Sequence, residues 1–145
     1  VVPTFRKAGP VAVKIRRRDW QLGDTWPKYQ AIRGGGNGAL ILGKPGLPVV
    51  LVESELDALL ITQEAPDLCS VMALGSASNR PHIAAADFLK AAPVILAALD
   101  FDTPDARGQR AGARAWLWWR EHFPQSRCWP PAIGKDPGEM HTAVS

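Results

Sequence analysis

The sequence predicts an α/β fold: a parallel sheet covered by helices on both faces, with a small α+β annex at the N-terminus. Three apolar, strand-like segments, each followed by a helical pattern, lead to this prediction. Two of them, "PVVLVE" and "VILAALD", are continuous apolar runs, which are typical of strands buried on both faces of a sheet. We expect the annex to span residues 1–47 and the parallel sheet residues 48–145.

Size and composition agree with this architecture. The chain has 145 residues, of which 46% are hydrophobic and 21% charged, as in a globular domain with one sizeable core. No apolar run approaches the ~20 residues that cross a bilayer, so we expect a cytoplasmic protein with no membrane partner. The start "VVPTFRKAGP" is neither a signal peptide nor an initiator Met, which suggests a piece of a longer protein. Cys69 and Cys128 lack the spacing of a zinc or redox motif and are expected to be reduced core residues.

The annex is expected to be irregular and basic. "VAVKIRRR" predicts a strand over residues 11–18, followed by a polar turn, a glycine-rich stretch and a short strand over residues 39–42. Net charge is +3, and "KIRRR" concentrates positive charge near the N-terminus. Such a patch favours a polyanionic partner, although a solvated strand face gives the same pattern. The Gly/Pro-rich residues 43–48 are the candidate linker to the sheet.

The first strand of the parallel sheet is "PVVLVE", residues 48–53. Ser54 with Asp57 three residues later predicts a capped helix start. We expect that helix to carry Leu56, Leu59 and Leu60 on one side.

The second and third strand-helix units follow in order. "SVMAL" is the second strand, and Pro81 is the expected first residue of the helix "HIAAADFLK". "VILAALD" is the third strand, and a longer connection leads to the helix "ARAWLWWREHF" and a short strand around "SRCW". Within that helix Trp116, Trp119 and Phe123 fall at i, i+3 and i+7, which predicts core packing rather than a base-stacking surface.

The last segment, "GKDPGEM", reads as the start of a helix. Asp136 is the expected N-cap, Pro137 the first helical residue and Glu139 the partner that closes a capping box.

Acidic residues end two of the predicted strands. Glu53 follows "PVVLV", and Asp100 and Asp102 follow "VILAAL". Since the carboxyl ends of parallel strands form one rim, these carboxylates should lie close together. They would repel one another unless a cation lay between them, and hard oxygen ligands suit Mg²⁺ or Mn²⁺. The alternative is that Glu53 only favours a helix N-terminus and "DFD" is a polar turn.

Two other patterns are set aside. Residues 38–44 fit GxxxxGK, but Pro45 replaces the Ser or Thr that would bind Mg²⁺, and "ALIL" predicts a strand rather than a phosphate loop. His82, His122 and His141 have no spacing that indicates a ligand set or a catalytic triad.

The order of "LVESELDAL", "MALGSAS", "LDFDTPDARGQRAGARA" and "GKDPGEM" resembles the Toprim family of primases, topoisomerases and certain nucleases. That family has a glutamate after its first strand and a DxD after its third, which match Glu53, Asp100 and Asp102. The resemblance covers Pro48 to about Met140 and implies a Rossmann-like Toprim domain. It also makes Asp57, Lys135 and Asp136 secondary site candidates.

Upstream, "VAVKIRRRDWQLGDTWPKYQAIRGGGNGALILG" resembles the strand-rich segment that precedes Toprim in bacterial-type primases, including its "PKY". The resemblance implies that this basic segment contacts template or nucleotide phosphates. The side chains it assigns to those contacts are Arg16, Arg17, Lys28, Tyr29 and Arg33. Two departures from the family are the neutral "GGGNGALIL" and the "NRPHI" after "LGSAS".

The resemblance therefore implies a DNA primase core that makes RNA primers on single-stranded DNA from nucleoside triphosphates, with two Mg²⁺ or Mn²⁺ ions. It also implies a helicase or a zinc-binding module elsewhere in the parent protein. The alternatives are a nucleic-acid-binding Toprim module without catalysis, or a Toprim nuclease or topoisomerase fragment. Tyr29, the single tyrosine, lies in "PKY" and so argues against a break-and-rejoin topoisomerase.

Overall fold

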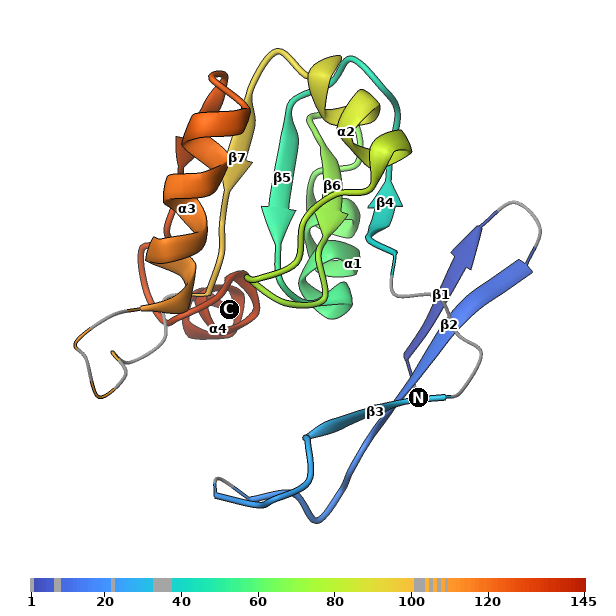
Figure 1. Ribbon diagram of the computed structural model, residues 1–145, viewed down its shortest axis with the longest axis vertical. Coiled ribbons are helices and arrows are strands. Elements are labelled where there is room, and N and C mark those ends of the chain that lie inside the picture. The colour runs from blue at the N-terminus through green and yellow to red at the C-terminus, as the bar shows by residue number, and fades with distance from the viewer. Residues whose placement is uncertain are drawn as a thin grey trace. The chain divides into compact units, whose positions relative to one another are not determined.

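The computed structural model divides the chain into two compact units, Val1–Gly38 and Ala39–Ser145 (Figure 1). This boundary lies nine residues before the predicted one at residue 48, because the strand around "ALIL" belongs to the sheet of the second unit. The structure describes residues 2–6, 9–21, 23–32, 38–100, 104, 106, 108 and 110–145.

The first unit is a three-stranded antiparallel sheet with the order β1-β2-β3. Its strands are β1 (Val2–Arg6), β2 (Gly9–Arg16) and β3 (Tyr29–Ala31). β2 confirms the strand predicted around "VAVKIRRR", whereas β1 and β3 were not predicted. Arg16 lies opposite Tyr29 in the register, so the basic end of β2 is next to the start of β3.

The second unit is an α/β fold built on a five-stranded sheet with the order β4-β6-β5-β7-β8. β4 runs antiparallel to β6, and the other pairs are parallel. The strands are β4 (Leu40–Leu42), β5 (Val49–Val52), β6 (Ser70–Ala73), β7 (Ile95–Ala97) and β8 (Ser126–Cys128). The helices are α1 (Glu55–Glu64), α2 (Ile83–Lys90), α3 (Ala111–His122) and α4 (Pro137–Val144).

Both faces of this sheet are buried, as the apolar strands predict. Successive residues of β5 alternate between two clusters: Val49 and Leu51 pack with residues of α2 and α3, and Val50 and Val52 pack with Ala58 of α1. Figure 1 accordingly shows α2 and α3 in front of the sheet and α1 behind it. The predicted parallel sheet with helices on both faces is thus confirmed, with one antiparallel edge strand.

The aromatic stripe of α3 is in the core. Trp119 is fully buried, Phe123 is 6% exposed, and Trp116 packs against the same cluster. Trp118, which is off this stripe, packs edge-on against Trp119 and stacks on the ring of His122. The core assignment of Trp116, Trp119 and Phe123 is therefore confirmed.

The buried side of α1 differs from the prediction. Ser54 caps the helix as expected, since its Oγ accepts the Asp57 N–H at 3.1 Å. Leu56 and Leu59, however, are about half exposed, at 49% and 50%, whereas Asp57 and Ala58 are buried. The helix faces the sheet through small Ala58, and the predicted leucine face was wrong.

The predicted start of α2 at Pro81 was also wrong, because the helix begins two residues later, at Ile83. Pro81 lies before the helix, and His82 is the N-cap, with Nδ1 accepting the Ala85 N–H at 3.1 Å. A neutral imidazole nitrogen can accept this bond as a serine oxygen would. His82 therefore has a capping role that the histidine spacing did not indicate.

The two cysteines are free, but only Cys69 is partly buried; Cys128 is exposed and was wrongly assigned to the core. β8 is an edge strand, so one side of it has no neighbouring strand to cover its residues. None of the helices in the described ranges is long and apolar enough to cross a membrane.

Candidate functional site

The candidate site lies where the carboxyl ends of β5, β6 and β7 meet. β5 is the central strand, with β6 on one side and β7 on the other. α1, which leads from β5 to β6, covers one face of the sheet, while α2 and α3 cover the other. The connections on the two sides of β5 thus run over opposite faces of the sheet. In α/β proteins, ligands bind beyond the carboxyl ends of the strands at such a point.

Glu53 follows the last residue of the central strand β5. Its Oε2 accepts the Ala77 N–H from the loop after β6 at 3.0 Å. Its Oε1 accepts the Asp100 N–H after β7 at 3.1 Å. One carboxylate thus connects the ends of three strands through two backbone N–H groups.

Asp100 and Asp136 share a lysine. Lys135 Nζ lies 3.4 Å from Asp100 Oδ2 and 2.7 Å from Asp136 Oδ2. The two aspartate side chains are only 18% and 15% exposed, and the lysine is 42% exposed. The Lys135 ammonium therefore bridges two mostly buried carboxylates. Because Asp136 precedes α4 and Asp100 follows β7, the bridge connects α4 to the end of β7.

Asp136 is also the N-cap of α4, as predicted. Its Oδ1 accepts the Glu139 N–H at 2.8 Å. Burial raises the pKa of Asp136, but the hydrogen bond and charge of Lys135 and the N–H groups of Glu139 and Gly138 together lower it below its ordinary value. Glu139 Oε2 accepts the Lys135 N–H at 3.1 Å. The predicted capping box would instead use the N–H of Asp136, one residue later.

Asp57 joins α1 to α4. It is 8% exposed, its Oδ1 accepts the Gly138 N–H at 3.1 Å, and its Oδ2 accepts the Ser54 hydroxyl at 2.6 Å. Burial raises the pKa of Asp57, the Asp136 carboxylate adds to the rise, and the hydrogen bonds from Ser54 and Gly138 oppose it. Asp57 and Asp136 thus lie near each other and belong to one electrostatic group.

Gly112, in the first turn of α3, allows the helix to approach Asp100. A Cβ at this position would lie 2.5 Å from the Asp100 carbonyl oxygen and 3.4 Å from Leu99 Cβ. No real Cβ atom fits at the first distance, so this glycine permits the close packing of α3 on the strand end. The "RAG" segment thereby helps to position the aspartate.

The residues that the structure brings together suit a hard divalent cation. The Glu53 carboxylate bonds to the backbone of Asp100, and Lys135 places a positive charge between Asp100 and Asp136. Carboxylate oxygens are the ligands that Mg²⁺ and Mn²⁺ prefer. Within the described ranges, no three acids, histidines or cysteines gather closely enough to hold an ion. Asp102, the third predicted ligand, lies outside the described residues, so the complete ligand set stays a prediction.

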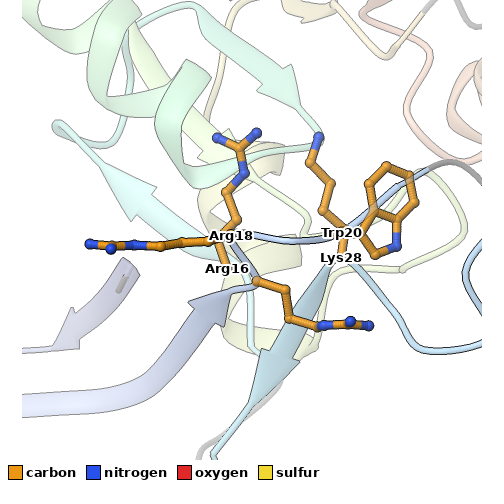
Figure 2. A pocket seen from close by; sticks show the side chains of 5 residues that line it. Arg16, Arg18, Trp20 and Lys28 are labelled. Atoms are coloured by element: carbon orange, nitrogen blue, oxygen red, sulfur yellow. The ribbon is translucent and has the colours of Figure 1, made fainter.

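A basic hollow lies in the first unit, at the end of β2 and the loop before β3 (Figure 2). Its volume is about 430 Å³, within the range of ligand sites (about 300–1,000 Å³). The side chains that line it are Arg16, Arg17, Arg18, Trp20 and Lys28. Four of these five carry positive charge.

Only some of the predicted phosphate-binding residues line this hollow. Arg16, Arg17 and Lys28 line the hollow, and Tyr29 starts β3 beside it, with its ring 5.9 Å from Lys28 Nζ. Arg33 lies outside the described residues. Arg17 is paired with Asp19 and Asp24 at 3.3 and 3.6 Å.

Sequence reasoning missed two residues of the hollow. Arg18 was counted only as part of a basic run, and Trp20 was not considered. Trp20 lies with its ring 5.6 Å from Lys28 Nζ, a cation–π distance. The signal that could have found it is an aromatic residue two positions after three consecutive arginines.

Comparison with known proteins gives matches in structure alone. No family model matches the sequence. No curated protein matches it either. The primase fragment of the bacteriophage T7 primase-helicase protein aligns over 98% of this chain and 56% of its own, with a TM-score of 0.61 and 16% identity.

Two bacterial structures match as well. The Aquifex aeolicus primase, with its zinc-binding and RNA polymerase domains, aligns over 98% of this chain and 36% of its own, with a TM-score of 0.59 and 19% identity. A DNA primase domain from Pseudomonas aeruginosa aligns over 97% of this chain and 46% of its own, with a TM-score of 0.60 and 23% identity. The chain therefore has the fold of these primase structures and spans 36% to 56% of their lengths.

Proposed function

We propose that the chain is the Toprim-containing core of a bacterial-type DNA primase, which joins ribonucleotides into short RNA primers on single-stranded DNA. The observation that carries the proposal is Glu53, whose carboxylate links the ends of three strands and accepts the backbone N–H of Asp100. The fold shared with primase structures supports the same conclusion.

In nucleotidyl transfer, a 3′-hydroxyl oxygen bonds to the α-phosphorus of a nucleoside triphosphate, pyrophosphate leaves, and the hydroxyl proton passes to water. Glu53, Asp100 and Asp102 would hold two Mg²⁺ or Mn²⁺ ions, which supply the positive charge that activates the hydroxyl and stabilises the leaving group. The backbone N–H groups on Glu53 keep its carboxylate in place while substrates exchange. Positioning and charge, rather than a covalent intermediate, account for the chemistry.

The basic hollow supplies the second requirement, a surface for phosphates. Arg16, Arg17 and Lys28 present guanidinium and ammonium groups from one strand end and one loop. Guanidinium groups bind phosphate oxygens in pairs, and the ammonium acts as a point charge. The substrates would be a single-stranded DNA template and nucleoside triphosphates, with Tyr29 and Arg33 contributing to the same surface.

We also infer that a helicase or zinc-binding module lies elsewhere in the parent protein. The T7 neighbour is part of a primase-helicase protein, and the A. aeolicus structure includes a zinc-binding domain. The two cysteines and three histidines of this sequence lack zinc-ligand spacing. With phosphate contacts but no zinc module, this chain should make RNA weakly and with little template preference, since backbone contacts position and base contacts specify.

A second candidate function is a nucleic-acid-binding module without catalysis. The observation that favours it is Lys135, which pairs with both Asp100 and Asp136. Lys135 offsets only part of their charge, and in a module without catalysis the acids would only hold α4 against the strand ends. A Toprim nuclease is the third alternative, and it would use the same carboxylates to cut rather than to join.

Incorporation of labelled ribonucleotides on single-stranded DNA with Mg²⁺ or Mn²⁺ tests the proposal. The wild-type chain should make short RNA, and Glu53→Gln should reduce synthesis by at least about 100-fold, because the substitution removes a carboxylate that the metal ions need. Glu64→Gln, at an exposed acid on the last turn of α1, is the matched control and should leave synthesis unchanged.

Other outcomes of this assay would indicate one of the two alternative functions. Nicking of duplex DNA without incorporation would show a nuclease. Neither activity, together with tight binding of single strands, would favour the binding module. Equal synthesis by wild type and Glu53→Gln would contradict the proposed site.

A further inference from the structure

We propose that Trp26 is a base-stacking residue, and that the basic hollow and Trp26 together bind single-stranded nucleic acid. Trp26 is 72% exposed, although indole is a large apolar group that proteins usually cover. It lies in the loop between β2 and β3, the loop that also supplies Arg18, Trp20 and Lys28 to the hollow. The inference rests on the proposed nucleic-acid substrate and adds the group that would contact its bases.

The loop is held in a defined shape. Its ends are joined by the Arg17 N–H, which donates to the Lys28 carbonyl at 3.0 Å. The Arg17 guanidinium pairs with Asp24 within the loop at 3.6 Å. These contacts close the segment at its base, so the loop presents its exposed residues from a constrained position.

A hydrogen bond connects the backbone of Trp26 to a residue of the hollow. Trp20 Nε1 donates to the Trp26 carbonyl at 3.1 Å, and Trp20 lines the hollow. Lys28 Nζ lies 5.6 Å from the Trp20 ring and 5.9 Å from the Tyr29 ring. The two aromatic rings attract the ammonium. The hydrogen bond holds the Trp26 backbone next to Trp20. Cation and exposed aromatic thus come from one cross-linked loop.

The charge of the hollow favours a polyanion. Asp19 and Asp24 both pair with Arg17, whereas Arg16, Arg18 and Lys28 form no ion pair with any acid among the residues that the structure describes. Three uncompensated cations in about 430 Å³ attract phosphate groups.

The exposed indole narrows the class of polyanion. A basic hollow alone would fit any chain of phosphates or sulfates, but an adjacent aromatic plane offers a surface on which a nucleobase can stack. In a duplex the faces of the bases are covered by their neighbours, so a side chain reaches them in a single strand. The combination of a basic groove and an aromatic platform is how single-strand binders work without sequence preference.

Binding of a fluorescent 12-nucleotide dT strand to the whole chain, measured by anisotropy, tests this inference. Trp26→Ala should weaken binding by about 5- to 160-fold, the range that one base stack contributes, and leave the slope of log affinity against log salt unchanged. Trp26→Phe should restore most of the affinity. Lys28→Ala should instead reduce the salt slope by about 0.7 per lost phosphate contact. Trp129→Ala, at an indole in the second unit that is 43% exposed, is the matched control.

An abasic strand of the same length separates stacking from charge. It should bind the wild type as weakly as dT binds Trp26→Ala, and Trp26→Ala should not weaken it further. Equal affinity of wild type and Trp26→Ala for dT, or equal affinity of wild type for dT and for heparin, would overturn the inference.

This experiment also distinguishes failure of the inference from failure of the proposed enzyme. Trp26-dependent binding without nucleotide incorporation would overturn the primase activity alone. Incorporation with binding that is insensitive to Trp26 would overturn the stacking role alone.

Discussion

At the scale of single residues, the candidate site is built from carboxylates whose positions the backbone determines. Glu53 accepts N–H groups from two neighbouring strand ends, and Asp57 accepts one from α4. These bonds hold the two carboxylates at the carboxyl end of β5 and in the first turn of α1. Lys135 offsets part of the negative charge of the site through its ion pairs with Asp100 and Asp136.

Replacement of Asp57 by Asn should change how stability depends on pH. Burial raises the folded-state pKa of Asp57, so its contribution to stability is fully present below the unfolded value of about 3.9 and is lost as pH rises through the folded value. Asn carries no charge at any pH but still offers an oxygen to the Gly138 N–H. Relative to wild type, the variant should therefore gain stability as pH rises from about 4 to 7.

Urea unfolding of both proteins at each pH measures this difference. Asp67→Asn, at an exposed aspartate, is the control. A constant difference between Asp57→Asn and wild type across the range would contradict the assignment of a buried, unfavourable charge to Asp57.

At the scale of elements, the packing of α3 on the end of β7 positions Asp100. Gly112→Ala places a methyl group 2.5 Å from the Asp100 carbonyl oxygen. The overpacking cost of about 1–3 kcal/mol exceeds the roughly 0.5–1 kcal/mol that alanine contributes in a helix. We expect a net loss of about 1–2 kcal/mol in the free energy of unfolding, together with weaker Mn²⁺ binding because Asp100 must shift.

Ala113→Gly provides a control of similar cost on the same helix. Ala113 is exposed, so its replacement lowers helix stability by about 1 kcal/mol without touching Asp100. Thermal unfolding and Mn²⁺ titration of both variants test the prediction. If the two bound Mn²⁺ equally, Gly112 would have no part in positioning the site.

Strand positions and the site edge could be predicted from the sequence because they depend on local pattern. The apolar runs ending at Glu53 and Asp100 imply buried strands whose ends share a rim, and the structure joins these residues by a hydrogen bond. Cap residues such as Ser54 and Asp136 were predicted for the same reason.

Features set by tertiary packing could not be predicted in this way. The exposure of Leu56 and Leu59 depends on small Ala58 facing the sheet. β4 pairs with β6, a strand about thirty residues later, which no local pattern indicates. Trp20 and Arg18 meet Lys28 only because the loop closes between Arg17 and Lys28. Each of these outcomes results from contacts between segments that are distant in the sequence or on opposite sides of a loop.

At the scale of the whole molecule, each of the two units carries one requirement of the proposed template-directed synthesis. The first has a basic hollow and an exposed indole in the same loop, and the second has the carboxylates at the strand ends. All enzyme functions considered for this chain depend on divalent ions at Glu53, Asp100 and Asp102. That ligand set is the central claim.

Calorimetric titration of Mn²⁺ into the wild type and the Asp100→Asn/Asp102→Asn double variant tests this claim most directly. The wild type should bind Mn²⁺, and the double variant should not, while its far-UV circular dichroism and thermal midpoint stay at or slightly above the wild-type values because like charges have been removed. Unchanged Mn²⁺ affinity in the folded double variant would contradict the account.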